Sequence, residues 1–224
     1  MRVYALLPVL ALASLVVPAL AADPSLETEE QKTLYALGLS VAQPLYNFTL
    51  SAEEFAIVRA GIEDGVLGHE PKIELQEYQT KLQELARTRM TAAAAGEKKK
   101  GAAFLAKAAE EKGATKTATG MVYQELTAGT GKSPQPTDRV KVHYTGKLMD
   151  GTVFDSSVER GEPAVFPLSR VIKCWTEGVQ LMKEGGKAKL ICPSDVAYGD
   201  RGQPPKIKPG ATLIFEVELL EVLA

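Results

Sequence analysis

Residues 140–157 read VKVHYTGKLMDGTVFDSS, and this stretch decides the fold of the C-terminal half of the chain. Apolar or aromatic residues alternate with polar ones from Val140 to Thr145, which is the period of a strand with one buried face. The Asp-Gly dipeptide at 150–151 is a hairpin turn signal, and a second short strand follows it at 152–155. The stretch therefore predicts an antiparallel β-hairpin.

Strand-like segments on both sides extend this hairpin into a sheet. They lie at residues 121–126, 188–192 and 213–219, the last with apolar residues at every second position. A single short helix is expected at about 175–183. A small antiparallel sheet wrapped around one short helix is an α+β fold, which we predict for residues 113–224.

The residues before this domain carry helical patterns. Capping-box sequences at 28–31 and 51–54 each begin a run of apolar residues spaced three or four apart. A third helix is expected to begin after Pro71 and to run on through residues 91–112, which are rich in Ala, Lys and Glu. Because two glycines lie within that segment, at 96 and 101, a flexible linker broken there is the alternative to a continuous helix.

The long third helix is expected to be a solvated spacer. Beyond Met90 its apolar stripe thins to Phe104 and Leu105, which is too little apolar surface for a core helix. We therefore assign residues 71–112 to a long linker helix that holds two parts of the molecule apart.

The two N-terminal helices are short and amphipathic, and a domain of this size is marginal by itself. Pairing with a second copy of the chain would bury their apolar faces. We therefore predict that residues 23–70 form an all-α dimerisation domain in a homodimer. The alternative is that these helices fold back onto the β-rich domain of the same chain.

The segment 1–22 has the composition of a secretory signal peptide. Arg2 precedes an almost wholly apolar run, small residues follow, and polar sequence starts at Asp23. A retained membrane anchor is the alternative. We expect the exported chain in the periplasm or in association with the outer membrane or cell surface. In an oxidising compartment Cys174 and Cys192 are able to form a disulfide, and two buried free thiols are the alternative state.

The overall composition excludes several classes of function. The formal net charge of -2 provides no basic excess to neutralise nucleic-acid phosphates. The two cysteines and two histidines lack metal-ligand spacing, so we expect neither a metal nor another cofactor. Beyond the signal peptide, no segment is long and apolar enough to span a bilayer.

Four segments of the C-terminal domain resemble the signatures of FKBP-type peptidyl-prolyl cis/trans isomerases. They are residues 142–157, 171–178, 197–199 and 209–219, and they occur in the order and spacing of that family. The helical arm in front of them is similar in architecture to the branch of the family that includes Mip and FkpA. The resemblance implies isomerisation of X–Pro bonds in unfolded or partly folded polypeptides, and inhibition by macrolides of the FK506 type.

The resemblance also implies which residues form the proline pocket. Catalytic roles match Tyr144, Asp155 and Tyr198. Substrate-binding positions match Phe154, Arg160, Phe166, Val171, Ile172, Trp175, Ile207 and Phe215. Taken singly, each aromatic residue on such strands is more often part of a core than of a binding site.

Three positions depart from the common family pattern. Ala164 stands where many members carry a wall aromatic, Gln203 where others have His or Val, and Cys174 where Gly is frequent. These differences bear on substrate preference and on macrolide affinity, but they leave the pocket in place.

Physical chemistry supports the implied activity. The X–Pro amide rotates slowly, over a barrier of about 18–20 kcal/mol, because its resonance must be broken. No bond to the substrate has to form, so a catalyst needs only to bind the twisted amide better than the planar forms. A dry aromatic pocket favours the less polar, twisted amide. Two other functions are the alternatives: a dimeric folding chaperone with secondary isomerase activity, and a structural partner-binding module.

Overall fold

The computed structural model describes residues 25–223, so the signal peptide predicted at 1–22 lies outside the described residues. The chain divides into two compact units, one ending at Ser40 and the other beginning at Val41. Within the described part of the chain, no helix combines the length and the apolar character needed to cross a membrane. The second unit contains the sheet and the candidate site.

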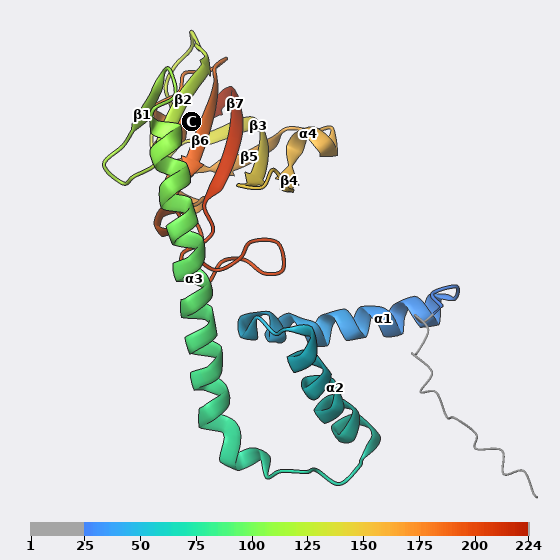
Figure 1. Cartoon of the computed structure of the whole chain (residues 1–224). Coiled ribbons are helices and arrows are strands. Elements are labelled where there is room, and N and C mark those ends of the chain that lie inside the picture. Colours follow the sequence, from blue (N-terminus) through green and yellow to red (C-terminus); the bar gives the residue numbers. More distant parts are fainter. Residues whose placement is uncertain (1–24, 224) are drawn as a thin grey trace, which may run out of the picture. The chain divides into compact units, whose positions relative to one another are not determined.

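The segments before the sheet are helical (Figure 1). They are α1 (Glu29–Ala42), η1 (Gln43–Phe48), α2 (Ala52–Leu67), η2 (Leu75–Tyr78) and α3 (Gln79–Ala109), where η marks a 3₁₀ helix.

Both predicted capping boxes are confirmed. The Gln31 backbone N–H donates to Thr28 Oγ1 over 3.2 Å, and the Gln31 side chain accepts from the Thr28 N–H over 2.9 Å. Ser51 and Glu54 exchange the same pair of hydrogen bonds, over 3.2 and 2.9 Å. These bonds satisfy backbone donors that a helix N-terminus leaves without intrahelical partners, so they define where α1 and α2 begin.

Helix α3 is continuous through both of its internal glycines, so the alternative of a broken linker is wrong. The helix begins at Gln79 rather than directly after Pro71. Residues 75–78 form the separate 3₁₀ turn η2, and Glu74 before it has an extended backbone. The extended Glu74 prevents a helix from running on from Pro71, and the 3₁₀ turn after it moves the start of the regular α-helix to Gln79.

The C-terminal part of the chain forms an antiparallel sheet (Figure 1). Its strands are β1 (Ala114–Lys116), β2 (Val122–Thr127), β3 (Arg139–Leu148), β4 (Val153–Ser156), β5 (Ala164–Pro167), β6 (Lys187–Cys192) and β7 (Leu213–Leu223). The order is β1-β2-β6-β7-β3-β4, and β5 pairs with the first half of β3. The segments between strands include α4 (Ser157–Arg160), η3 (Leu168–Arg170), α5 (Lys173–Gln180) and η4 (Ser194–Val196). The predicted α+β arrangement is confirmed.

Several short elements are not predicted by the sequence pattern. β1, β5 and α4 have only three or four residues each, which is too short for a periodic signal. α5 starts at Lys173 and ends at Gln180, earlier than the expected 175–183. It ends there because the Leu181 N–H turns to the carbonyl of Gly178 over 3.2 Å, which tightens the last turn.

Both faces of the sheet are covered, because neighbouring residues of a strand point to opposite faces. Leu190 of β6 lies in the main core with Val179 of α5. The next residue, Ile191, faces the other way and packs with Leu105 and Ala108 of α3. Helix α5 and the end of α3 therefore lie on opposite faces of the sheet.

The prediction that the end of α3 is a solvated spacer is wrong for residues 94–108. Ala94 and Gly101 are buried there, as are the two residues that contact β6. A Cβ at Gly101 would overlap the side chain of Thr212. Small residues let the helix approach the domain closely, so Leu105 together with Ala and Gly residues is enough for contact, and the sequence pattern of large apolar side chains underestimates it.

Candidate active site

One face of the sheet holds an aromatic cavity of about 330 Å³. It is lined by Tyr144, Phe154, Asp155, Phe166, Arg170, Val171, Ile172, Trp175, Tyr198 and Phe215. These residues come from β3, β4, β5 and β7, from α5, and from the segments beside α5 and η4. The fold thus gathers most of the residues that the family resemblance assigns to the pocket.

Trp175 lies at the centre of this cage, in the first turn of α5, and only 4% of its surface is exposed. The rings of Tyr144, Phe166 and Phe215 meet it edge to face, with centroid distances of 5.1, 5.7 and 5.5 Å. Phe154 packs on Phe215 in the same way, at 5.6 Å. Perpendicular contacts of this kind are favourable for aromatic pairs, so the rings hold the cage open in a preformed shape.

Strand alternation and one glycine explain how the rings converge. Tyr144 and Gly146 are two residues apart on β3 and therefore face the same side of the sheet. A Cβ on Gly146 would lie 2.6 Å from the Phe154 ring and 2.9 Å from the Phe215 ring. Any larger residue at this position would therefore push the two rings out of their contact.

A polar cluster borders the cage. The Tyr144 hydroxyl donates a hydrogen bond to Asp155 Oδ2, and Arg160 Nη1 donates to Asp155 Oδ1. Arg160 Nη2 also donates to the Tyr144 hydroxyl oxygen over 3.1 Å. Arg160 reaches the cluster from α4, where the Glu159 N–H donates to Ser156 Oγ over 3.2 Å and caps the turn.

The charge state of this cluster follows from its surroundings. Burial raises the pKa of Asp155, but the hydrogen bonds from Tyr144 and Arg160 outweigh it, so the pKa lies below its ordinary value. Burial, together with the hydrogen bond to Asp155, raises the pKa of Tyr144. Burial and the nearby Asp155 charge raise the pKa of Tyr198. At neutral pH the cluster therefore holds one carboxylate and two neutral phenols.

The other two predicted residues lie next to the cage. Arg160 is joined to it through its hydrogen bonds to the Tyr144 hydroxyl and to Asp155. Ile207 lines an adjoining cavity of about 340 Å³, which also includes residues 203–206. Ala164 packs against the main core, and Phe166, two residues along β5, lines the cage instead.

Sequence reasoning missed Arg170 and Lys206. Arg170 lines the aromatic cavity and directly precedes Val171, so its adjacency to a family-like segment is a signal that could find it. Lys206 lines the adjoining cavity beside Ile207, in an irregular loop where no periodic pattern marks it.

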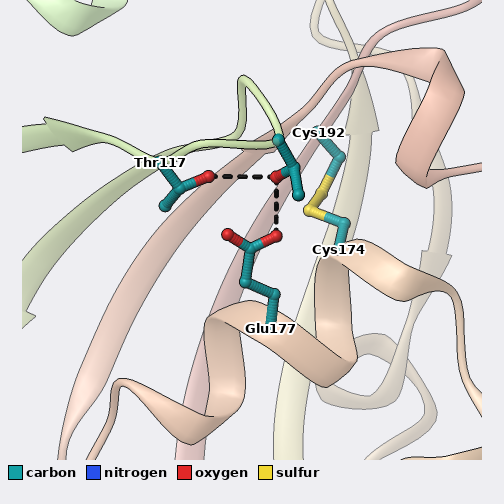
Figure 2. Close-up of a disulfide and its surroundings, with 5 residues drawn as sticks. Thr117, Cys174, Glu177 and Cys192 are labelled. Atoms are coloured by element: carbon teal, nitrogen blue, oxygen red, sulfur yellow. Dashed lines mark hydrogen bonds between the residues drawn. A yellow bond between two sulfur atoms is a disulfide. The ribbon is translucent and has the colours of Figure 1, made fainter.

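A disulfide joins Cys174, the residue before Trp175, to Cys192 at the end of β6 (Figure 2). The two Cα atoms are 5.8 Å apart, and both side chains are fully buried. On the same helix, Glu177 accepts a hydrogen bond from Thr119 Oγ1 over 2.6 Å. These two links attach α5, and with it the centre of the aromatic cage, to the sheet and to the loop before β2.

A contact between His143 and Ser157 lies close to the site but does not form a hydrolytic centre. His143 Nδ1 is 3.1 Å from Ser157 Oγ. Ser157 is fully buried, and its Oγ accepts a hydrogen bond from the Tyr144 backbone N–H over 2.8 Å. A nucleophile must be open to substrate, so Ser157 has a structural role in tying β3 to α4.

Comparisons with known proteins agree with this geometry. Residues 130–220 match the family model of FKBP-type peptidyl-prolyl cis-trans isomerase. Residues 30–124 match the model of the domain amino terminal to FKBP-type peptidyl-prolyl isomerase. Among solved structures, the chain is similar to the crystal structure of FkpA from Escherichia coli. That similarity covers 89% of this chain and 99% of the other, with 37% identity and a TM-score of 0.65.

Two named bacterial proteins are similar to this chain over most of its length. The FKBP-type peptidyl-prolyl cis-trans isomerase FkpA of Aeromonas hydrophila is 43% identical over 92% of this chain and 81% of its own length. The FKBP-type 22 kDa peptidyl-prolyl cis-trans isomerase of Escherichia coli K12 is 42% identical over 89% of this chain and 98% of its own length. These relatives support isomerase activity and do not favour a mainly chaperone function. The chain is therefore an enzyme of the FKBP-type peptidyl-prolyl cis-trans isomerase family.

Proposed function

We propose that the aromatic cavity accelerates rotation about X–Pro bonds by holding the proline ring on Trp175 while the preceding amide twists. The observation that carries this proposal is the combination of a preformed ring cage with a polar cluster at one edge. The cage excludes water and favours the twisted, less polar amide over the planar forms. Catalysis then needs no covalent step, because the protein binds the transition state better than either ground state.

Each polar group has a distinct place in this proposal. The Tyr198 hydroxyl, kept neutral by its raised pKa, donates a hydrogen bond to the carbonyl oxygen of residue X. The Asp155 carboxylate, held by Tyr144 and Arg160, faces the carbonyl carbon of that same residue. On the other side of the proline, the backbone N–H of Ile172 is available to the substrate. Ile172 is the N-cap of α5, so its N–H takes no part in the helical ladder.

The test is exchange NMR on an Ala-Leu-Pro-Phe peptide with the full chain and its variants. Replacing Tyr198 by Phe removes one neutral hydrogen bond and is expected to lower kcat/KM by about three- to tenfold. Replacing Asp155 by Ala leaves Tyr144 and Arg160 without their acceptor, and a loss of about tenfold or more is expected.

Tyr123→Phe is the matched control for the tyrosine change. Tyr123 on β2 packs at the edge of the main core and lines neither cavity, so this variant is expected to keep the wild-type rate. Full activity in both the Tyr198 and the Asp155 variants would refute the assigned roles. A macrolide of the FK506 type is expected to compete with the peptide for the cavity, and uncompetitive inhibition would place it elsewhere.

We infer also that the chain is exported, on the basis of the signal-peptide pattern at 1–22. A relative from Legionella longbeachae, 35% identical over 88% of this chain, is named Outer membrane protein MIP. Export predicts that the mature protein recovered from a cell-envelope fraction begins near Asp23. An intact N-terminus on protein recovered from the cytoplasm would contradict it.

The exposed apolar side chains of α1 and α2 support a homodimer through the arm. Leu34 and Leu37 of α1 are 61% and 60% exposed, and Ile57 and Val66 of α2 are 76% and 77% exposed. A second copy would remove this apolar surface from water. Light scattering is expected to give twice the chain mass for the wild type and a lower mass for Leu37→Glu. The control is Lys32→Glu, which changes a polar residue of the same helix and is expected to stay dimeric. A wild-type protein with the mass of one chain would refute the proposed dimer.

A further inference from the structure

The proline cage has a second cavity at one edge. This second cavity measures about 340 Å³, and it shares Phe154, Asp155 and Tyr198 with the cage. Its other lining residues, 203–207, belong to the loop between η4 and β7. Three residues line both cavities. When the proline of a peptide is bound in the cage, the side chain of a residue next to that proline is therefore able to reach the loop.

The proposed roles at the active site determine which neighbour this is. Tyr198 and Asp155 face the carbonyl group of the residue before proline, and both line the second cavity. Val171 and Ile172 line the cage but not the second cavity. The second cavity therefore receives the side chain of residue X in X–Pro, an assignment that rests on the proposed function.

The electrostatics of the second cavity favour an anion. Lys206 Nζ donates one hydrogen bond, over 2.8 Å, to the carbonyl of Phe154, which places the ammonium group on the cavity wall. An ammonium has three N–H donors, so two of them are left for a ligand. The Asp155 carboxylate on the same wall is paired with the guanidinium of Arg160, which offsets its charge.

The remaining lining of the second cavity is compatible with a carboxylate ligand. Gln203 and Ile207 bond to each other through their backbones, over 2.7 and 3.0 Å, so the loop is held in a closed turn. The Gln203 side-chain amide takes no part in that turn and is exposed at the cavity. Arg170 lines the aromatic cage and not the second cavity, so Lys206 supplies the cation in the lining of the second cavity.

We propose that Lys206 makes this enzyme favour an acidic residue directly before proline over a neutral polar residue of the same size. The carboxylate of Glu or Asp at that position forms an ion pair with the Lys206 ammonium. The chemistry that recognises the client is thus an aromatic cage for the proline ring and a cation for the preceding side chain. Lys206 is a specificity-determining residue, and the aromatic cage supplies the rate acceleration.

The test compares kcat/KM of the full chain on four peptides, Ala-X-Pro-Phe, where X is Glu, Gln, Lys or Leu. Because the ion pair is partly exposed to solvent, the expected preference of the wild type for Glu over the isosteric Gln is about two- to fivefold. Lys at X is expected to be slower than Gln. Lys206→Gln is expected to bring the Glu to Gln ratio to one, and Lys206→Glu to make Lys faster than Glu.

Lys208→Gln is the matched control, with the same loss of charge two residues further along the loop. Lys208 lines neither the cage nor the second cavity, so the Glu preference is expected to persist in this variant. The preference is also expected to shrink with added salt, because salt screens exposed charges. A wild-type Glu to Gln ratio of one, or a preference that survives in Lys206→Gln, overturns the inference.

The Leu peptide separates this inference from the proposed function. Acceleration of Ala-Leu-Pro-Phe with no dependence on the charge at X refutes only the role of Lys206. Failure to accelerate any of the four peptides refutes the proposed function of the cage itself.

Discussion

Reduction of the disulfide between Cys174 and Cys192 is expected to lower the free energy of unfolding by about 3 kcal/mol. The bond joins residues 18 positions apart in the sequence, from α5 to the end of β6. A cross-link over a loop of this length restricts the unfolded chain, and the chain-entropy relation gives the stated value. Both cysteines are fully buried, so the two thiols formed on reduction have to fit into a packed core, and any packing cost adds to this loss.

The assay is urea unfolding followed by the fluorescence of Trp175, which is the only tryptophan in the chain and lies next to the disulfide. The buried bond is reduced by unfolding in urea with dithiothreitol and refolding under the same reductant. With an m-value of about 1–3 kcal/mol/M, the loss corresponds to a fall of about 1–3 M in the urea midpoint.

The control is the double variant in which Cys174 and Cys192 are both Ala. Its urea midpoint is expected to be low with or without dithiothreitol, which separates loss of the bond from any other effect of the reductant. An unchanged midpoint for the wild type, after thiol titration has shown two free thiols, would refute the reasoning from loop closure.

Three further predictions concern glycines and charges. Gly146→Ala is expected to displace the two rings beside it and lower kcat/KM about tenfold in the peptide assay, whereas Gly96→Ala, with nothing within 4 Å of its Cβ, is expected to keep the rate. In urea unfolding, Gly96→Ala is expected to gain up to about 1 kcal/mol from helix propensity. Gly101→Ala in the same helix is expected to lose stability, because its methyl group overlaps a buried threonine. A gain at both positions would show that α3 does not pack closely on the domain. The pH profile of kcat/KM is expected to be flat from about pH 5 to 9, because the pKa of Asp155 is lowered from its ordinary value by hydrogen bonds and that of Tyr198 is raised from its ordinary value by burial. A rate that changes tenfold within that window would mean that one of these groups titrates during catalysis.

Local signals account for the elements that the sequence predicts well. The capping boxes at 28–31 and 51–54 define helix starts through bonds that reach only three residues along the chain. The alternation along β3 reflects burial of every second side chain, which any strand with one covered face requires. The α+β class followed from these patterns and from the order in which they occur.

The family-like segments identified most of the cavity lining, because the residues of a motif keep their spacing even when their contacts are long-range. They did not identify Arg170 or Lys206. Polar side chains at a cavity edge come from irregular segments, whose position depends on the packing of other elements. The consequences of the departures at Ala164 and Gln203 likewise depend on the tertiary structure. Phe166 forms the cage wall near Ala164, and Gln203 lines the second cavity.

The sequence by itself determined the longer helices and strands, though not β1, β5 or α4, and it determined which residues belong to the family motifs, because periodicity and motif spacing are local properties. The tertiary structure decided how α3 meets the domain: residues 94–108 dock through Leu105 and through Ala and Gly, whose small side chains carry almost no hydrophobic signal. It also decided that Cys174 lies within bonding distance of Cys192, and that Lys206 reaches a cavity shared with Asp155. Such contacts depend on the distance between elements far apart in the chain, and no local pattern contains that distance.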